Sequence, residues 1–107
     1  MSTLDDREKG FERKFAHDAE MQFKAEARRN KLLGLWAAEK MGMTGDAAEA
    51  YGKEVIAADF EEAGDEDVYR KVSGDLAAKN AGVEEAELRA KMAELLAEAK
   101  GQLMDEA

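Results

Sequence analysis

The sequence contains neither cysteine nor proline, and β-branched and aromatic residues are scarce. Without thiols the chain cannot form disulfides or thiolate metal sites, and it has no cysteine nucleophile. Too few residues favour β-strands to build a sheet. Alanine, glutamate, lysine and leucine dominate instead, and these residues lose little entropy in a helix. The composition therefore predicts an all-α protein, and the absence of cysteine fits a reducing cytoplasm.

Long apolar runs are absent as well. No stretch approaches the roughly 18 consecutive apolar residues that a membrane-spanning helix needs. Residues 1–10 are charged and lack the apolar core of a secretory signal. We therefore expect a soluble cytoplasmic protein that does not insert directly into a membrane. Its 107 residues suffice for one domain with a modest core.

The charge is unevenly distributed along the chain, whose net charge is −9. Residues 1–31 carry eight bases and seven acids, whereas residues 32–107 carry eight bases and eighteen acids. The acidic part would repel a phosphate backbone, which argues against nucleic acid as a partner. The asymmetry indicates that the first third of the chain has a role of its own.

Residues suited to catalysis or metal binding are few. His17 is the only histidine, and its neighbour Asp18 would not face it on a helix. A di-iron bundle needs Glu-x-x-His motifs, but Lys14 stands three residues before His17. The acidic stretch from Asp59 to Asp67 does not match the spacing of a calcium loop. We predict no catalytic residues, no metal site and no enzyme activity, with His17 either on the surface or in contact with a partner.

Apolar spacing and turn residues predict a four-helix bundle preceded by a flexible or helical N-terminal arm. The arm covers residues 1–18 and the bundle residues 19–107. Asp46 is expected to cap the second helix in a capping box with Glu49, and Asp65 to cap the third. The four expected helices are 18–40, 47–63, 66–79 and 83–102.

The arm carries phenylalanines at a strict four-residue spacing, Phe11 and Phe15, followed by Ala19 and Phe23. If the bundle begins near Phe23, Phe11 and Phe15 lie beyond its end. They would then either anchor the arm in a partner's groove or fold back onto the bundle. Charged residues flank them on both sides, so the arm is two-faced.

A basic cluster, Arg28, Arg29 and Lys31, lies in the first expected helix of the bundle. On a helix these side chains could meet a nucleotide phosphate or an acidic protein surface. The alternative is a solvated face paired with neighbouring carboxylates. Trp36, the only tryptophan, is expected to pack in the core.

The run FAHDAEMQFKAEARRNKLLGLWAA at residues 15–38 resembles the zeta subunit of alphaproteobacterial F-type ATP synthases, their ATPase inhibitor subunit. Three shorter segments agree with that family, namely DDRE at 5–8, DFEEAG at 59–64 and AKMAELL at 90–96. The resemblance covers essentially the whole chain, and the long run is its most specific part.

The resemblance implies a regulatory inhibitor that acts on the cytoplasmic face of the membrane-bound synthase. The N-terminal segment of the family enters a catalytic interface between the alpha and beta subunits, close to the gamma shaft, and blocks rotation in the hydrolytic direction. The partner-binding residues implied here are Asp5, Asp6, Arg7, Glu8, Phe11, Glu12, Arg13, Lys14, Phe15, His17 and Asp18.

Two other functions stay open at this point. One is a nucleotide-binding sensor bundle without inhibitory activity, in which Arg28, Arg29 and Lys31 hold ATP or ADP. The other is a scaffold that binds some other acidic or helical partner through the same arm. No further cofactor is expected.

Overall fold

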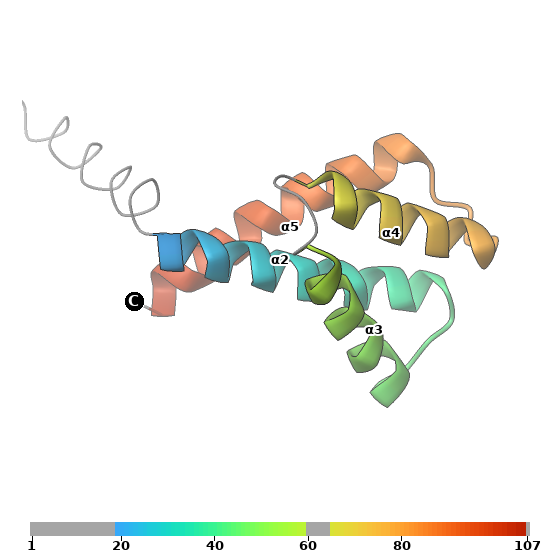
Figure 1. Ribbon diagram of the computed structural model, residues 1–107, viewed down its shortest axis with the longest axis horizontal. Coiled ribbons are helices and arrows are strands. Elements are labelled where there is room, and N and C mark those ends of the chain that lie inside the picture. The colour runs from blue at the N-terminus through green and yellow to red at the C-terminus, as the bar shows by residue number, and fades with distance from the viewer. Residues whose placement is uncertain (1–18, 60–64, 107) are drawn as a thin grey trace, which may run out of the picture.

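The computed structural model describes residues 19–59 and 65–106. They form four helices, α2 (Ala19–Lys40), α3 (Gly45–Ala58), α4 (Glu66–Ala78) and α5 (Glu85–Glu106), and no strand within those ranges. The long helices α2 and α5 run antiparallel, and α2 contacts each of the other three helices (Figure 1). The predicted all-α fold with four bundled helices is confirmed. The division into an arm and a bundle stays a prediction, because residues 1–18 lie outside the described residues.

Helix boundaries differ from the predicted ones at both ends of α3. The residue before the helix is Thr44, and Asp46 lies in its first turn, where a carboxylate favours the positive end of the helix dipole. The predicted capping box of Asp46 and Glu49 is wrong, because the helix starts earlier and has no side-chain cap. At the other end α3 stops at Ala58, and the predicted end at 63 falls outside the described residues.

α5 begins two residues later than predicted and continues four residues further, to Glu106. Its last turn is held by one apolar contact that the residue spacing predicts and by one ion pair that it does not show. Leu103 is buried, and Arg28 of α2 pairs with Glu106 at 2.8 Å. These contacts keep the chain helical to Glu106, beyond the predicted end at residue 102.

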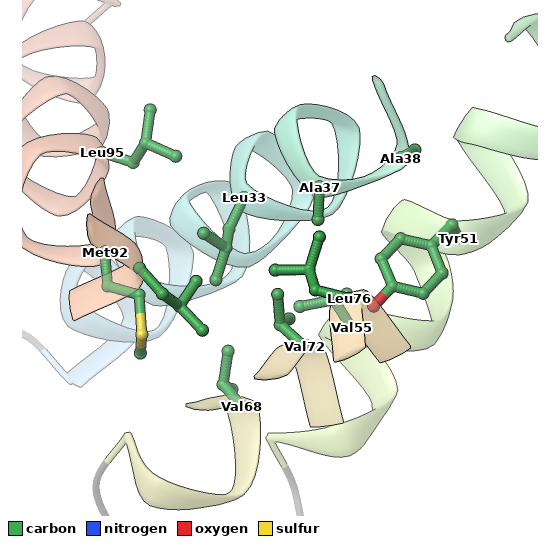
Figure 2. Packing of buried hydrophobic residues seen from close by; sticks show 11 residues of the cluster. Leu33, Ala37, Ala38, Tyr51, Val55, Val68, Val72, Leu76, Met92 and Leu95 are labelled. Carbon is green, nitrogen blue, oxygen red and sulfur yellow. The ribbon is translucent and has the colours of Figure 1, made fainter. Parts of the chain in front are cut away.

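The core forms from the apolar stripes that the spacing predicts (Figure 2). α2 contributes Leu33 and Ala37 between the stripes of the other helices. Burying each Val or Leu side chain stabilises the fold by about 1.5–3 kcal/mol. Trp36 only partly enters this core, with the ammonium groups of Lys40 and Lys91 5.7 and 5.8 Å from its ring centre. The stripes of the other three helices are Tyr51 and Val55, then Val68, Val72 and Leu76, then Leu88, Met92 and Leu95.

Two glycines mark the place where the backbones of α2 and α3 come closest. A Cβ atom on Gly34 would lie 2.6 Å from the Cα atom of Gly52, a distance that real Cβ atoms essentially never show. A Cβ on Gly52 would instead meet the backbone oxygen of Lys31 at 3.5 Å, which is ordinary contact. The close crossing therefore depends on Gly34 more than on Gly52.

Two adjacent polar side chains of α2, Arg29 and Asn30, lie inside the protein, each only 1% exposed. Arg29 Nη2 donates to Asp65 Oδ1 at 2.9 Å, and Asn30 Nδ2 donates to Asp59 Oδ2 at 3.0 Å. Arg29 Nε also donates to Asn30 Oδ1 at 2.6 Å. Asp59 directly follows α3 and Asp65 directly precedes α4. These four residues, which we call the α2 clamp, tie both ends of the α3–α4 connection to α2.

Burial and neighbouring charges change the pKa of the Asp59 carboxyl. Burial raises the pKa of its carboxyl above the ordinary value, and the charges of Glu26 and Asp65 act in the same direction. The hydrogen bond from Asn30 and the charge of Arg29 lower that pKa, but less than burial raises it. The folded state therefore binds a proton at Asp59 more tightly than the unfolded chain does.

Replacing Gly34 by alanine tests the close crossing. We expect Gly34→Ala to lower the free energy of unfolding by about 1–3 kcal/mol, because its methyl group overpacks the helix contact. Gly52→Ala is the matched control, with a change between zero and a gain of about 1 kcal/mol from better helix propensity. Urea unfolding followed by circular dichroism measures both variants. Equal destabilisation by the two variants would show that Gly34 does not set how closely the backbones of α2 and α3 approach.

The raised pKa of Asp59 predicts that Asp59→Asn stabilises the protein at pH 7. Because the folded protein holds the Asp59 proton more tightly than the unfolded chain does, wild-type stability falls as the pH rises through the folded pKa, and an uncharged amide carries no such loss. As the pH falls through the folded pKa, the native carboxyl takes up a proton and the advantage of the variant shrinks. Urea unfolding at pH 7 and pH 4 measures the difference.

Asp65→Asn is the contrasting variant for this test. It leaves the buried guanidinium of Arg29 without its carboxylate partner, so we expect a loss of about 1–3 kcal/mol at pH 7. An Asp59→Asn protein less stable than wild type at pH 7 would contradict the view that the buried carboxylate of Asp59 destabilises the fold while the carboxylate of Asp65 stabilises it.

Candidate functional site

The partner-binding residues predicted for the arm all lie in residues 5–18, outside the described residues. Their roles therefore stay predictions that rest on the sequence and its family resemblance. The basic cluster of α2 does lie within the described residues, and the surface around it is the candidate site that the structure shows.

The three basic residues of that cluster point to three different elements. Arg28 Nη1 donates to Glu106 Oε2 at 2.8 Å and to Gln102 Oε1 at 3.4 Å, both on α5. Arg29 belongs to the α2 clamp and is shielded from solvent. Lys31 Nζ lies 4.0 Å from Glu49 Oε2 on α3. Since Arg29 would have to leave its clamp to meet a ligand, only Arg28 and Lys31 present their charges at the surface.

Arg28 and Lys31 line the same shallow groove, which has a volume of about 360 Å³. It lies between α2, the end of α3 and the end of α5. We call it the basic groove, because the three cations Lys24, Arg28 and Lys31, spaced four and three residues apart, form one row on α2. Four apolar residues, including the half-exposed Phe23, complete its lining. The groove is lined by Phe23, Lys24, Ala27, Arg28, Lys31, Ile56 and Leu103.

Each cation of the groove has a carboxylate at hand. Lys24 Nζ is 3.1 Å from Glu20 Oε1, and the partners of Arg28 and Lys31 are the acids of α5 and α3 already described. Such partly exposed ion pairs contribute only about 0–1 kcal/mol each, because solvent screens them. A ligand with its own carboxylates or phosphates can therefore take over these cations at little cost.

A second hollow, of about 180 Å³, lies over Tyr51 between α3 and α4. The Tyr51 hydroxyl donates to Asp75 Oδ2 at 2.8 Å, and Lys71 Nζ donates to the same oxygen at 3.0 Å. Burial, reinforced by the hydrogen bond and charge of Asp75, raises the pKa of Tyr51 well above its ordinary value. The phenol therefore stays protonated at neutral pH and keeps donating its hydrogen bond to Asp75.

Among residues 19–59 and 65–106 no three histidine, cysteine or acidic side chains are grouped so that they could hold a metal ion. In the same residues no helix is both long and apolar enough to cross a membrane.

Sequence reasoning missed the α2 clamp, although a signal for it existed. Arg29 stands in the row Ala25, Arg29, Leu33 and Ala37, whose members repeat every four residues and are all buried. A charged residue in an apolar row indicates a buried ion pair, because an unpaired charge there would be too costly. Treating Arg29 as one of three equivalent surface cations overlooked this row.

Comparison with known proteins agrees with the four-helix fold. The family described as ATPase inhibitor subunit zeta matches residues 1–102. A protein solved by solution NMR is 66% identical, covers 81% of this chain and 99% of its own, and superposes with a TM-score of 0.73. No curated protein matches the chain. Because the family match spans nearly the whole sequence, the chain belongs to the ATPase inhibitor subunit zeta family.

Proposed function

We propose that this protein inhibits ATP hydrolysis by an F-type ATP synthase through its N-terminal arm, residues 1–18. The arm enters a catalytic interface between the alpha and beta subunits beside the gamma shaft, and so blocks rotation in the hydrolytic direction. The observation that carries this proposal is the family match, which begins at residue 1 and therefore includes the arm. The protein acts on the cytoplasmic face of the membrane-bound enzyme and has no catalytic residues of its own.

The arm has the length and chemistry for such a wedge. Eighteen residues span about 27 Å as a helix, enough to reach into a deep cleft. Burying Phe11 and Phe15 there contributes on the order of 1.5–3 kcal/mol each. The charged residues around them set register and orientation more than affinity. A wedge that holds one interface in one conformation stops a cycle that needs that interface to open.

The four helices support this division of labour. Among the described residues the buried apolar side chains begin at Ala25 and the α2 clamp at Arg29, which supports a helical body with a core of its own. The body can then stay outside the cleft and hold the arm at its entrance.

Nucleotide binding in the basic groove is a second candidate function, favoured by the row of Lys24, Arg28 and Lys31 beside an apolar floor. The cations would meet the phosphates of ATP or ADP, and Phe23 would lie against the base. Arg29, which the sequence pattern included, takes no part because it is held in the clamp.

Phe15→Ala tests the wedge. We expect it to weaken inhibition of ATP hydrolysis roughly ten- to hundredfold, since a buried phenylalanine contributes 1.5–3 kcal/mol. Thermal stability should stay unchanged. Lys9→Ala, on the same arm, is the control and should retain most of the potency. A Phe15→Ala protein as potent as wild type would rule out phenylalanine anchoring.

Isothermal titration with ATP tests the second candidate. If the groove binds nucleotide, Arg28→Ala and Lys31→Ala should each weaken binding about ten- to hundredfold, as expected for a hydrogen bond to a charged group. The control is Lys53→Ala, which removes an exposed lysine of α3 outside the groove lining. Absence of binding heat with the wild-type protein would exclude this function.

A further inference from the structure

Three carboxylates of the chain itself pair with the three cations of the basic groove. Each comes from a different helix, and each is more than half exposed to solvent. Solvent screening makes such pairs weak, so the cations can exchange them for the carboxylates of another molecule. The chain's own contacts thus show that a carboxylate fits at every cation of the row. The three acids are Glu20 of α2, Glu49 of α3 and Glu106 of α5.

The spacing of the cation row indicates the shape of a fitting partner. The three cations follow one another at four and three residues, which separates them by about 6 and 4.5 Å along the axis of α2. Carboxylates at the same spacing on one face of a second helix lie at matching intervals. Beside the row, Phe23 is 55% exposed, and Ile56 and Leu103 add apolar surface. A helix with an acidic row beside an apolar strip therefore matches both parts of the groove.

The groove lies at the end of the body from which the arm departs. Ala19 begins α2, and the cation row ends at Lys31, about 18 Å further along the helix. The end of α5 lies beside this part of α2 (Figure 1). The hollow over Tyr51 is at the other end, where Met41 follows α2. With residues 1–18 inside a cleft of the synthase, Ala19 stands at its mouth, and the basic groove comes to lie beside that mouth.

We propose that the basic groove docks on a carboxylate-bearing amphipathic helix at the outer surface of the synthase head, beside the cleft that the arm enters. This inference rests on the proposed function, because insertion of the arm brings the groove to that place. The arm blocks rotation, and the groove lengthens the life of the complex. Residues 32–107 carry eighteen acids and eight bases, so the acidic body repels such a helix and the cation row orients it.

Charge reversal in the row tests docking, with the full-length protein binding to immobilised synthase head in biolayer interferometry. Arg28→Glu and Lys31→Glu should each weaken binding about five- to fiftyfold, because each puts a like charge against the partner's carboxylates. Lys79→Glu is the matched control. It makes the same charge change at the hollow over Tyr51 and should alter binding less than about twofold. Circular dichroism confirms the helical content of each variant.

Removing the chain's own competing carboxylates should act in the opposite direction. Glu49→Gln and Glu106→Gln free Lys31 and Arg28 for the partner, so we expect each to strengthen binding about two- to fivefold. Glu54→Gln, at the hollow over Tyr51, removes the same charge and is the control. If Glu54→Gln strengthens binding as much as the other two, general attraction between the protein and the head explains the effect, and docking through the groove is overturned.

ATP hydrolysis by the same head separates docking from the block itself. Because the arm is unaltered, Arg28→Glu and Lys31→Glu should raise the concentration for half inhibition and leave inhibition at saturation complete. Incomplete inhibition at saturation, or binding equal to that of Lys79→Glu, would overturn the docking role and leave inhibition by the arm intact. Wild-type protein that binds through the groove without slowing hydrolysis would instead disprove the inhibitor function and leave the groove as a contact surface.

Discussion

The buried guanidinium of Arg29 is the constraint around which the rest of the structure is arranged. A charge that is 1% exposed requires a carboxylate, and the nearest one belongs to Asp65 at the start of α4. Asn30 makes the parallel contact to Asp59 at the end of α3. Two neighbouring residues of α2 thus fix the end of α3 and the start of α4 against α2. The apolar stripes of the helices pack between these two fixed points.

The same stretch of α2 also forms the surface of the basic groove. Residues 25, 29 and 33 face the interior, whereas Lys24, Arg28 and Lys31 face outward with exchangeable partners. One helix thereby separates a fixed inner row from an outer row that is available for binding.

Local patterns were sufficient to predict the four helices and their core stripes, because Val68, Val72 and Leu76, for example, recur at helical spacing. They failed where a distant partner decides the local structure. Asp65 precedes α4 as predicted, but its carboxylate serves Arg29 and not the helix end. Gly52 lies inside α3 against Gly34 of α2, a close approach that the spacing of apolar residues does not reveal. The basic cluster was predicted, but the burial of Arg29 and the groove lining depend on α3, α4 and α5 together.

Inhibition by residues 1–18, carried on a body that folds without them, is the central claim of this account. The most direct test is ATP hydrolysis by the purified synthase head with the full-length protein and with residues 19–107 alone. The account predicts that the shortened protein keeps its cooperative thermal unfolding and loses its inhibition. Full inhibition by residues 19–107 would contradict it, because the inhibitory contacts would then belong to the helical body.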